Sequence, residues 1–296
     1  TPRVNQLLKL MLPAMLGAGV VQINLLIDVI LASTLPTGSV SYLYYADRIN
    51  QLPLAVIGIA IGTALLPKMS RNIQAGRDAA ANEDQEKSLG IGLILTIPAA
   101  FGLMVLSDPI ITTLFQRGAF DTTSTTSTAL ALACYSAGLP AFVIIKIFQP
   151  NFFARHDTAT PVKIAAVSVV INLILNLILM QYFAHAGLAM ATSISAWLSA
   201  ILFVILLKSK NFYSPRKQSV GKIIRIILAA SVMGLGLFAL NEVSKDFFQN
   251  SNLLGTCILL LLIFCGGLIY FISLFLFNAI NKEEIVANLK RWSVRD

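Results

Sequence analysis

Long apolar stretches recur along the whole chain and constrain its fold more than any other feature. The stretch LLGTCILLLLIFCGGLIYFISLFLF, residues 253–277, contains no charged residue. As a helix, a stretch of about 18 or more residues crosses the ~30 Å hydrocarbon core of a bilayer. Hydrophobic residues make up 56% of the 296 and charged residues only 12%, against about 25% charged in soluble domains. The sequence therefore predicts an all-α, polytopic transmembrane helical bundle.

Gly, Pro and charge breaks divide these stretches into eight predicted helices. They lie near residues 5–34, 38–66, 88–108, 124–149, 160–184, 187–207, 220–241 and 253–278. Basic residues concentrate in alternate connections, whereas the opposite connections carry only Arg117 and Lys245. By the positive-inside rule both termini face the cytoplasm. The net charge of +8 therefore mostly reflects the orientation of the chain in the membrane. The sequence shows no basic face on a soluble domain that would bind nucleic acid.

The two ends of the chain carry separate signals. The chain begins TPRVN without an initiator Met, shortly before an apolar run, which suggests the C-terminal part of a larger protein, although processing gives the same start. Near the other end, Ile285, Leu289 and Trp292 repeat with helical spacing beside Lys290 and Arg291. This pattern predicts that residues 279–296 form a short amphipathic helix and tail in the cytoplasmic interface.

Arg48 is the charge that the composition explains least. It follows Asp47 and lies 12 residues past Pro36, which places it ~18 Å along the helix. A charge near the bilayer centre costs at least ~2.5 kcal/mol. Pro53 cannot donate a helical hydrogen bond and makes a hinge beside the charged pair. The Arg fork matches phosphate oxygens, so we predict an anion site in a cavity. The alternative is a structural ion pair, for which adjacent Asp47 is poorly oriented.

Lys146 and a group of oxygen-bearing side chains are further candidates. Lys146 is predicted either to contact substrate or to extend towards the near interface. A possible site for Na⁺ or a proton combines the Asp28 carboxylate with polar side chains of other helices, which are Asn172, Asn176 and Thr192. The alternative is interhelical hydrogen bonding, worth ~0.6 kcal/mol per bond.

No arrangement of residues indicates an enzyme. His156 and His185 lie in predicted connections without a nucleophile beside them, and the sequence has no phosphate-cradling glycine loop. The three cysteines lie in apolar runs without metal-ligand spacing, as is typical of structural thiols.

Three stretches, YYADRINQLPLAVIGIAIGTALLPKMSR (44–71), LFQRGAFDTTST (114–125) and FFARHDTATPVKI (152–164), resemble signatures of the MurJ (MviN) family of lipid II flippases. This family belongs to the multidrug/oligosaccharidyl-lipid/polysaccharide exporter superfamily, and the resemblance covers essentially the whole chain. It implies helices seven to fourteen of a two-lobed transporter, with a second lobe at about 1–210 and an added helix pair at about 217–278.

The resemblance also implies a function. The family moves lipid II, the undecaprenyl-pyrophosphate-linked peptidoglycan precursor, to the outer leaflet of the bacterial inner membrane by alternating access. Arg48 would face the head group, and the final helix pair would form a groove for the prenyl tail. Asp47 and Lys146 are further candidates for the substrate-binding site, on the residues and not on the resemblance. Asp28, Asn172, Asn176 and Thr192 match a cation site, although Asn176 is an amide where some relatives carry an acid. The first lobe would be the missing partner.

Three alternatives stay open on the sequence. A drug/cation antiporter of the same superfamily is expected to place acids rather than Arg48 in its cavity, and a lipid-oligosaccharide flippase shares the anionic carrier. A non-transporting membrane scaffold would depend on close helix packing, as at GIAIG (58–62), and not on Arg48.

Overall fold

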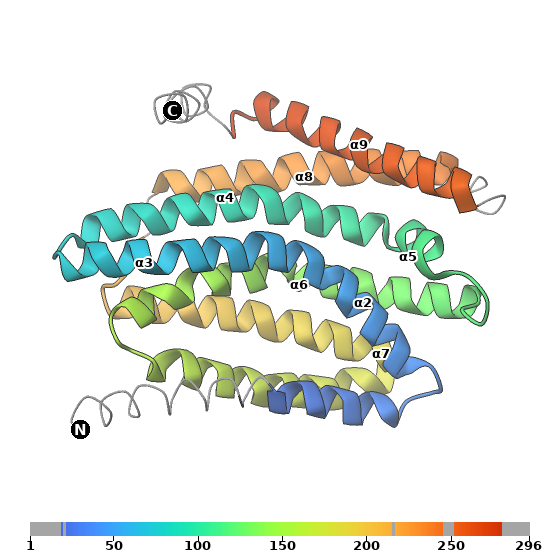
Figure 1. Ribbon diagram of the computed structural model, residues 1–296, viewed down its shortest axis with the longest axis horizontal. Helices are drawn as coiled ribbons and strands as arrows, with labels where there is room; N and C mark the ends of the chain where they lie inside the picture. Colours follow the sequence, from blue (N-terminus) through green and yellow to red (C-terminus); the bar gives the residue numbers. More distant parts are fainter. Residues whose placement is uncertain (1–18, 20–21, 215–216, 245–251, 280–296) are drawn as a thin grey trace.

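The computed structural model describes residue 19 and residues 22–214, 217–244 and 252–279, and all regular structure in this part is helical. Six described helices are long and apolar enough to cross a membrane. They lie side by side with roughly parallel axes, and α8 and α9 form an outer pair next to α4 (Figure 1). The elements are an apolar helix over Gln22–Ser33, α2 (Ser39–Pro53), η1 (Leu54–Ile59), α3 (Ala60–Gln74), α4 (Asp78–Val105), α5 (Ser107–Phe115), α6 (Thr122–Ala154), α7 (Ala159–Ser209), α8 (Lys217–Ser244) and α9 (Asn252–Leu276).

The all-α bundle is confirmed, but two predicted boundaries are wrong. The predicted connection at 67–87 is mostly helical, because α3 continues to Gln74 and α4 begins at Asp78. Residues 78–87 are polar or small, but most of them are the good helix formers Ala, Glu, Gln and Lys, and Glu83 pairs with Lys87 one turn later at 2.5 Å. The short helix α5 was not predicted. The amphipathic helix expected near Ile285 lies outside the described residues.

The second span is a single helix of 36 residues with a widened turn in its middle. Pro53 ends α2, and the π-helix η1 follows directly. Since Pro53 has no N–H, the carbonyl of Ile49 loses its usual helical donor, and the backbone continues with the wider π spacing. The irregularity therefore lies where the sequence places a hinge.

Glycines allow this span to approach α6 closely. A Cβ on Gly62 would lie 2.9 Å from the carbonyl oxygen of Lys146, and one on Gly58 would lie 3.3 Å from Val143. Pro150 cannot donate to the Lys146 carbonyl, so the Gly62 backbone packs against an oxygen that lacks its usual donor within α6. The close helix approach expected from GIAIG is confirmed.

The predicted helices 160–184 and 187–207 are confirmed as two arms of α7. The helix breaks at Ala184, which has φ 48° and ψ −128°. The chain turns back so tightly that a Cβ on Gly187 would lie 2.3 Å from the Leu179 carbonyl oxygen. Only glycine fits at this position.

A proline also explains how α9 is attached to the rest of the bundle. Pro98 lies inside α4 and leaves the Ile94 carbonyl without its helical donor. The Tyr270 hydroxyl of α9 donates to that carbonyl at 2.7 Å. In lipid a freed backbone group needs another hydrogen-bond partner, which a neighbouring helix can provide, and α9 supplies the donor here.

Candidate functional site

Four side chains on α2 form a polar patch around Arg48. The Gln51 amide donates to the Asp47 carboxylate and accepts from Arg48 Nη1 at 3.4 Å. The guanidinium lies over the Tyr44 ring, 4.8 Å from its centroid. Tyr44, Arg48 and Gln51 are exposed, and Asp47 is half-buried. The i, i+3, i+4 and i+7 spacing places all four on one face of the helix.

Asp47 does not neutralise Arg48 by a direct ion pair. Across the described part of the chain, the residues that pair with acids include neither Arg48 nor Lys146. The expected poor orientation of Asp47 is consistent with this, because its carboxylate takes the Gln51 amide instead. Most of the guanidinium donors therefore remain available to an anion.

Lys146 lies on a different helix and at a different level. It is exposed on α6, and its side chain passes Gly58, whose Cβ would lie 3.6 Å from the Lys146 Cγ. Gly58 follows Arg48 by ten residues, which is ~15 Å along a helix. Arg48 and Lys146 therefore both lie beside the span Ser39–Gln74, but at different levels and not in one common contact.

The predicted oxygen-bearing residues do come together. Asn176 donates to Asp28 at 2.6 Å and to Asn172 at 2.9 Å, and Asn24 donates to Asp28 at 3.2 Å. Asn172 also donates to the Thr192 hydroxyl at 3.4 Å. We call Asn24, Asp28, Asn172, Asn176, Thr192 and Ser195 the polar cluster, since Ser195 accepts a further bond from Asn172 at 3.4 Å.

The polar cluster fits a small monovalent cation or a proton. It combines one carboxylate with amide and hydroxyl oxygens, which are hard ligands. Asn172 and Asn176 are buried, and Asn176 Oδ1 has no hydrogen-bond partner. With its amide in the opposite orientation, Asn172 would donate to Asn24 and Asp28 at 3.1 and 3.2 Å and accept the Thr192 backbone N–H at 3.2 Å, so either orientation bonds it within the cluster. No group of three or more His, Cys, Asp or Glu suited to a metal occurs among the residues that the structure describes.

An elongated apolar cavity of about 600 Å³ lies between α4, α6, α7 and α8. Its wall on α4 runs from Leu89 to Met104, ~22 Å at 1.5 Å per residue. Tyr213 lies at the connection between α7 and α8, where burial and then the negative charge of Glu86 raise its pKa to about 12. The cavity could hold an alkyl chain but offers little to a polar ligand.

The motif LFQRGAFDTTST has a structural explanation. Asp121 accepts the Ser124 backbone N–H at 2.8 Å and caps α6. Hydrogen bonds from the backbone and then from the side chain of Ser124 lower the pKa of the Asp121 carboxyl. Phe115 and Phe120 pack against Tyr45 with ring centroids 4.8 and 5.6 Å apart. The motif therefore attaches the turn between α5 and α6 to α2, just before Arg48.

The sequence did not single out four of the residues at these sites. Tyr44 and Gln51 complete the Arg48 patch, and Asn24 and Ser195 complete the polar cluster. Helical spacing could have indicated three of them, because Tyr44, Gln51 and Asn24 lie four residues from Arg48, Asp47 and Asp28. Ser195 depends on how the two α7 arms pack.

Comparison with known proteins identifies the family. The family described as "Lipid II flippase MurJ" matches residues 1–258. The chain belongs to the MurJ family. The "Probable lipid II flippase MurJ" of Rhizobium tropici is 38% identical over 293 residues, which are 98% of this chain and 55% of that protein. The protein of the same name from Vibrio cholerae is 40% identical over 233 residues, covering 78% of this chain and 44% of that one.

Solved structures agree with the assignment to MurJ. A structure titled "Lipid II flippase MurJ, inward closed conformation" superposes with a TM-score of 0.76 at 28% identity, covering 93% of this chain and 55% of that one. A MATE family transporter in an outward-facing conformation has a TM-score of 0.59 at 18% identity over 90% of this chain and 64% of that one, and shares the fold alone. The chain spans about half the length of the curated relatives that it matches.

Proposed function

We propose that this chain works as one half of a lipid II flippase in the bacterial cytoplasmic membrane. It carries the lipid-linked peptidoglycan precursor from the inner to the outer leaflet by alternating access. The support is the family membership, the MurJ-like fold and, above all, an arginine within a predicted span that is exposed and is paired with no acid of the described residues. A flippase moves its substrate without covalent chemistry, so the proposal needs no enzyme activity.

The proposal assigns separate roles to parts of the chain. Residues 1–210 form the second lobe, which encloses a wet cavity together with a first lobe of the same protein. Both termini of the chain face the cytoplasm. Residues 217–278 form the added pair, and the apolar cavity beside α8 takes part of the prenyl tail. The widened turn after Pro53 serves as a hinge for the half of the span that carries Arg48.

In this proposal the Arg48 patch binds the diphosphate of the head group. The Tyr44 ring and the Gln51 amide orient the guanidinium, and Asp47 keeps the Gln51 amide in place. A planar fork can donate two parallel hydrogen bonds to phosphate oxygens, whereas an ammonium acts as a point charge. Lys146 supplies a second positive charge at another level of the same path.

The polar cluster is proposed to bind the coupling ion, Na⁺ or H⁺. Asp28 would supply the charge, and Asn172, Asn176 and Thr192 would supply neutral oxygens. Asn176 is an amide, which leaves the cluster one formal negative charge and suits a monovalent ion. Occupation would change how the helix Gln22–Ser33 packs against the first arm of α7, because Asp28 and Asn176 join these elements.

The experiment that tests the function is lipid II translocation in membranes that carry the chain within a full-length MurJ protein. Arg48→Ala and Arg48→Lys are compared at matched expression, with Arg71→Ala and Arg71→Lys as controls at the other end of the same span. Loss in both Arg48 variants with normal insertion supports a bidentate anion contact. Loss in Arg48→Ala alone means that charge suffices. Normal rates in both would remove the anion site from the account.

A further inference from the structure

The two arms of α7 form an antiparallel hairpin that is joined at several levels. The break at Ala184 joins the arms at one end. Near the middle, Asn172 on the first arm reaches Thr192 and Ser195 on the second. At the open end, Lys210 bonds to Asp157 and Thr160. The two residues of each pair lie at nearly equal distances in sequence from Ala184, as expected for two antiparallel arms that stay side by side along their length.

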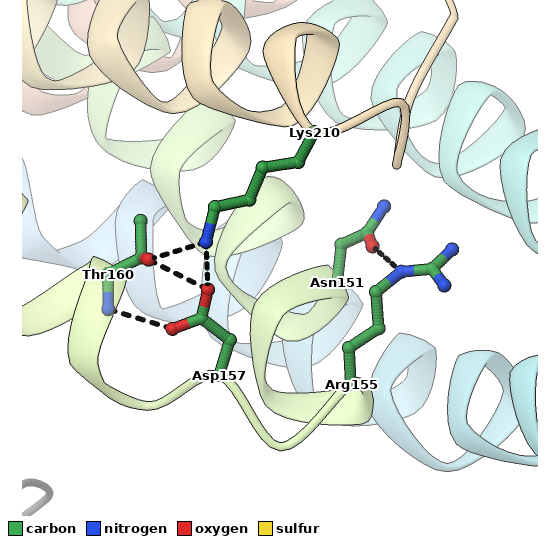
Figure 2. A network of polar contacts seen from close by, with 5 residues as sticks. All are labelled: Asn151, Arg155, Asp157, Thr160 and Lys210. Carbon is green, nitrogen blue, oxygen red and sulfur yellow. Dashed lines mark hydrogen bonds and ion pairs between the residues drawn. The ribbon is translucent and has the colours of Figure 1, made fainter.

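The open end is closed by a compact polar network (Figure 2). Lys210 Nζ lies 2.5 Å from Asp157 Oδ2 and 3.0 Å from Thr160 Oγ1. The same carboxylate accepts the Thr160 backbone N–H at 3.0 Å and the Thr160 hydroxyl at 2.7 Å. Asp157 therefore caps the first arm while it binds the residue that follows the second arm.

The electrostatics favour the ionised form of Asp157. Partial burial alone would raise the pKa of Asp157, but hydrogen bonds from Lys210 and Thr160 and the charge of Lys210 outweigh it. The pKa of this carboxyl therefore lies below its ordinary value. The Asp157 side chain is 20% exposed and that of Lys210 is 39% exposed, so the pair is screened less than an ion pair on an open surface.

Other contacts fix the Lys210 side of this network to the bundle. Arg155 lies over the Phe212 ring at 4.4 Å, pairs with Asp78 of α4 and donates to Asn151 at 3.1 Å. Asn151 in turn donates to the buried Gln85 of α4 at 2.7 Å. The end of the second arm is thus anchored to α4 and α6.

The first arm buries fewer residues than the second. Its buried residues are Pro161, Ile164, Asn172 and Asn176, and all other buried residues of α7 lie on the second arm. Five large apolar side chains of the first arm are exposed in the described structure, and they are Val167, Val170, Ile174, Leu177 and Ile178. The second arm packs extensively against α6, where Ser193 donates to the Cys134 carbonyl and Trp197 to that of Ala137. The separation of the arms near Asn172 and Asn176 therefore depends on the contacts that cross the hairpin.

We propose that Lys210, Asp157 and Thr160 form a latch that sets the spacing of the two α7 arms and so positions the Asn172 and Asn176 amides beside Asp28. Lys210 is a positioning residue and does not touch the ion itself. The link from the latch to ion binding rests on the proposed coupling role of the polar cluster. The spacing of the arms does not depend on that role.

The test measures arm spacing and ion response in the same variants. Spin labels are attached at Ile174→Cys and Ile194→Cys, which lie at the level of the polar cluster, after Cys134, Cys257 and Cys265 are replaced by alanine. Lys210→Met and Asp157→Asn are expected to broaden and lengthen the distance between the labels. Lys208→Met is the matched control, since Lys208 is exposed near the end of the same arm and forms none of the ion pairs in the described structure.

The ion response is the Na⁺-dependent rise in melting temperature, with choline chloride as the ionic-strength control. In Lys210→Met, half of the rise is expected to need roughly threefold to tenfold more Na⁺. Lys210→Arg and the exchange Asp157→Lys with Lys210→Asp are expected to restore part of the response. A merely structural contact would lower the melting temperature without changing the Na⁺ requirement.

The outcomes separate the two proposals. Unchanged label distances in Lys210→Met and Asp157→Asn overturn the latch. Changed distances with an unchanged Na⁺ requirement overturn its positioning role. If the unsubstituted protein shows no response to Na⁺ or pH, the coupling role of the cluster is wrong, and changed distances still support the latch. If Lys210→Met fails to insert, Thr160→Val is measured instead, because it weakens the latch and retains both charges. The same changes in label distance and Na⁺ requirement then support or overturn the proposal.

Discussion

The contact between Tyr270 and Pro98 makes a quantitative prediction about the attachment of α9. Tyr270→Phe removes the only donor that the described structure provides from another helix to the Ile94 carbonyl. Interhelical hydrogen bonds in membrane proteins are worth ~0.6 kcal/mol on average and up to ~1.7, and a buried unsatisfied group costs ~1–3 kcal/mol. Since Tyr270 is only 6% exposed, we expect a loss of about 1–2 kcal/mol in the free energy of unfolding.

Pro98→Ala gives this prediction its control. Alanine restores the N–H that α4 lacks, so the Ile94 carbonyl regains a helical donor. In the Pro98→Ala background Tyr270→Phe is expected to cost less than about 0.5 kcal/mol, a coupling of about 1 kcal/mol in a double-mutant cycle. Reversible unfolding in mixed micelles measures all four proteins. Tyr182→Phe, at a position that is 77% exposed, controls for removal of a hydroxyl. An equal cost of Tyr270→Phe in both backgrounds would refute the argument.

Four further results are expected. Gly62→Ala places a Cβ 2.9 Å from the Lys146 carbonyl oxygen and is expected to lower stability in thermal unfolding by about 1–3 kcal/mol, whereas Gly90→Ala, with nothing within 4 Å, is expected to be neutral or stabilising. The lowered pKa of Asp157 means that its stabilisation is present above the ordinary pKa and is lost as pH falls towards the folded value. The difference in melting temperature between the unsubstituted protein and Asp157→Asn should then stay constant from about pH 8 to about pH 5 and become smaller below about pH 4. Asp28→Asn is expected to abolish the Na⁺-dependent rise in melting temperature, and a retained rise would move the ion elsewhere. Pro53→Ala restores a helical donor and is expected to slow lipid II translocation with little loss of stability, while a normal rate would argue against the hinge.

The sequence predicts the spans well because burial in lipid demands long apolar helices. It misses the start of α4 because Asp78–Lys87 is polar, and apolarity alone cannot distinguish a charged helix from a connection. It also misses α5, which is too short to span a bilayer.

The residues of the candidate sites also divide into those that the sequence predicts and those that it misses. Asp28, Asn172, Asn176 and Thr192 stand out because polar groups are rare in these spans, and the structure brings them together. The role of Gln51 is less evident from sequence, since an exposed Gln is common and its value depends on bridging Asp47 and Arg48. The latch was not predicted at all: Lys210 and Asp157 lie in polar connections 53 residues apart, where charge is ordinary, and only the folded hairpin brings them together.

The central claim is that Arg48 faces water and meets the substrate diphosphate. It is tested most directly by the reactivity of single cysteines at positions 48 and 51 towards a charged, membrane-impermeant thiol reagent, with and without lipid II. Leu261→Cys is the comparison, because Leu261 is 60% exposed on the highly apolar α9. We expect fast labelling at 48 and 51, slow labelling at 261, and protection of the first two by lipid II. Labelling of positions 48 and 51 as slow as that of position 261, or labelling that lipid II leaves unchanged, would contradict the account.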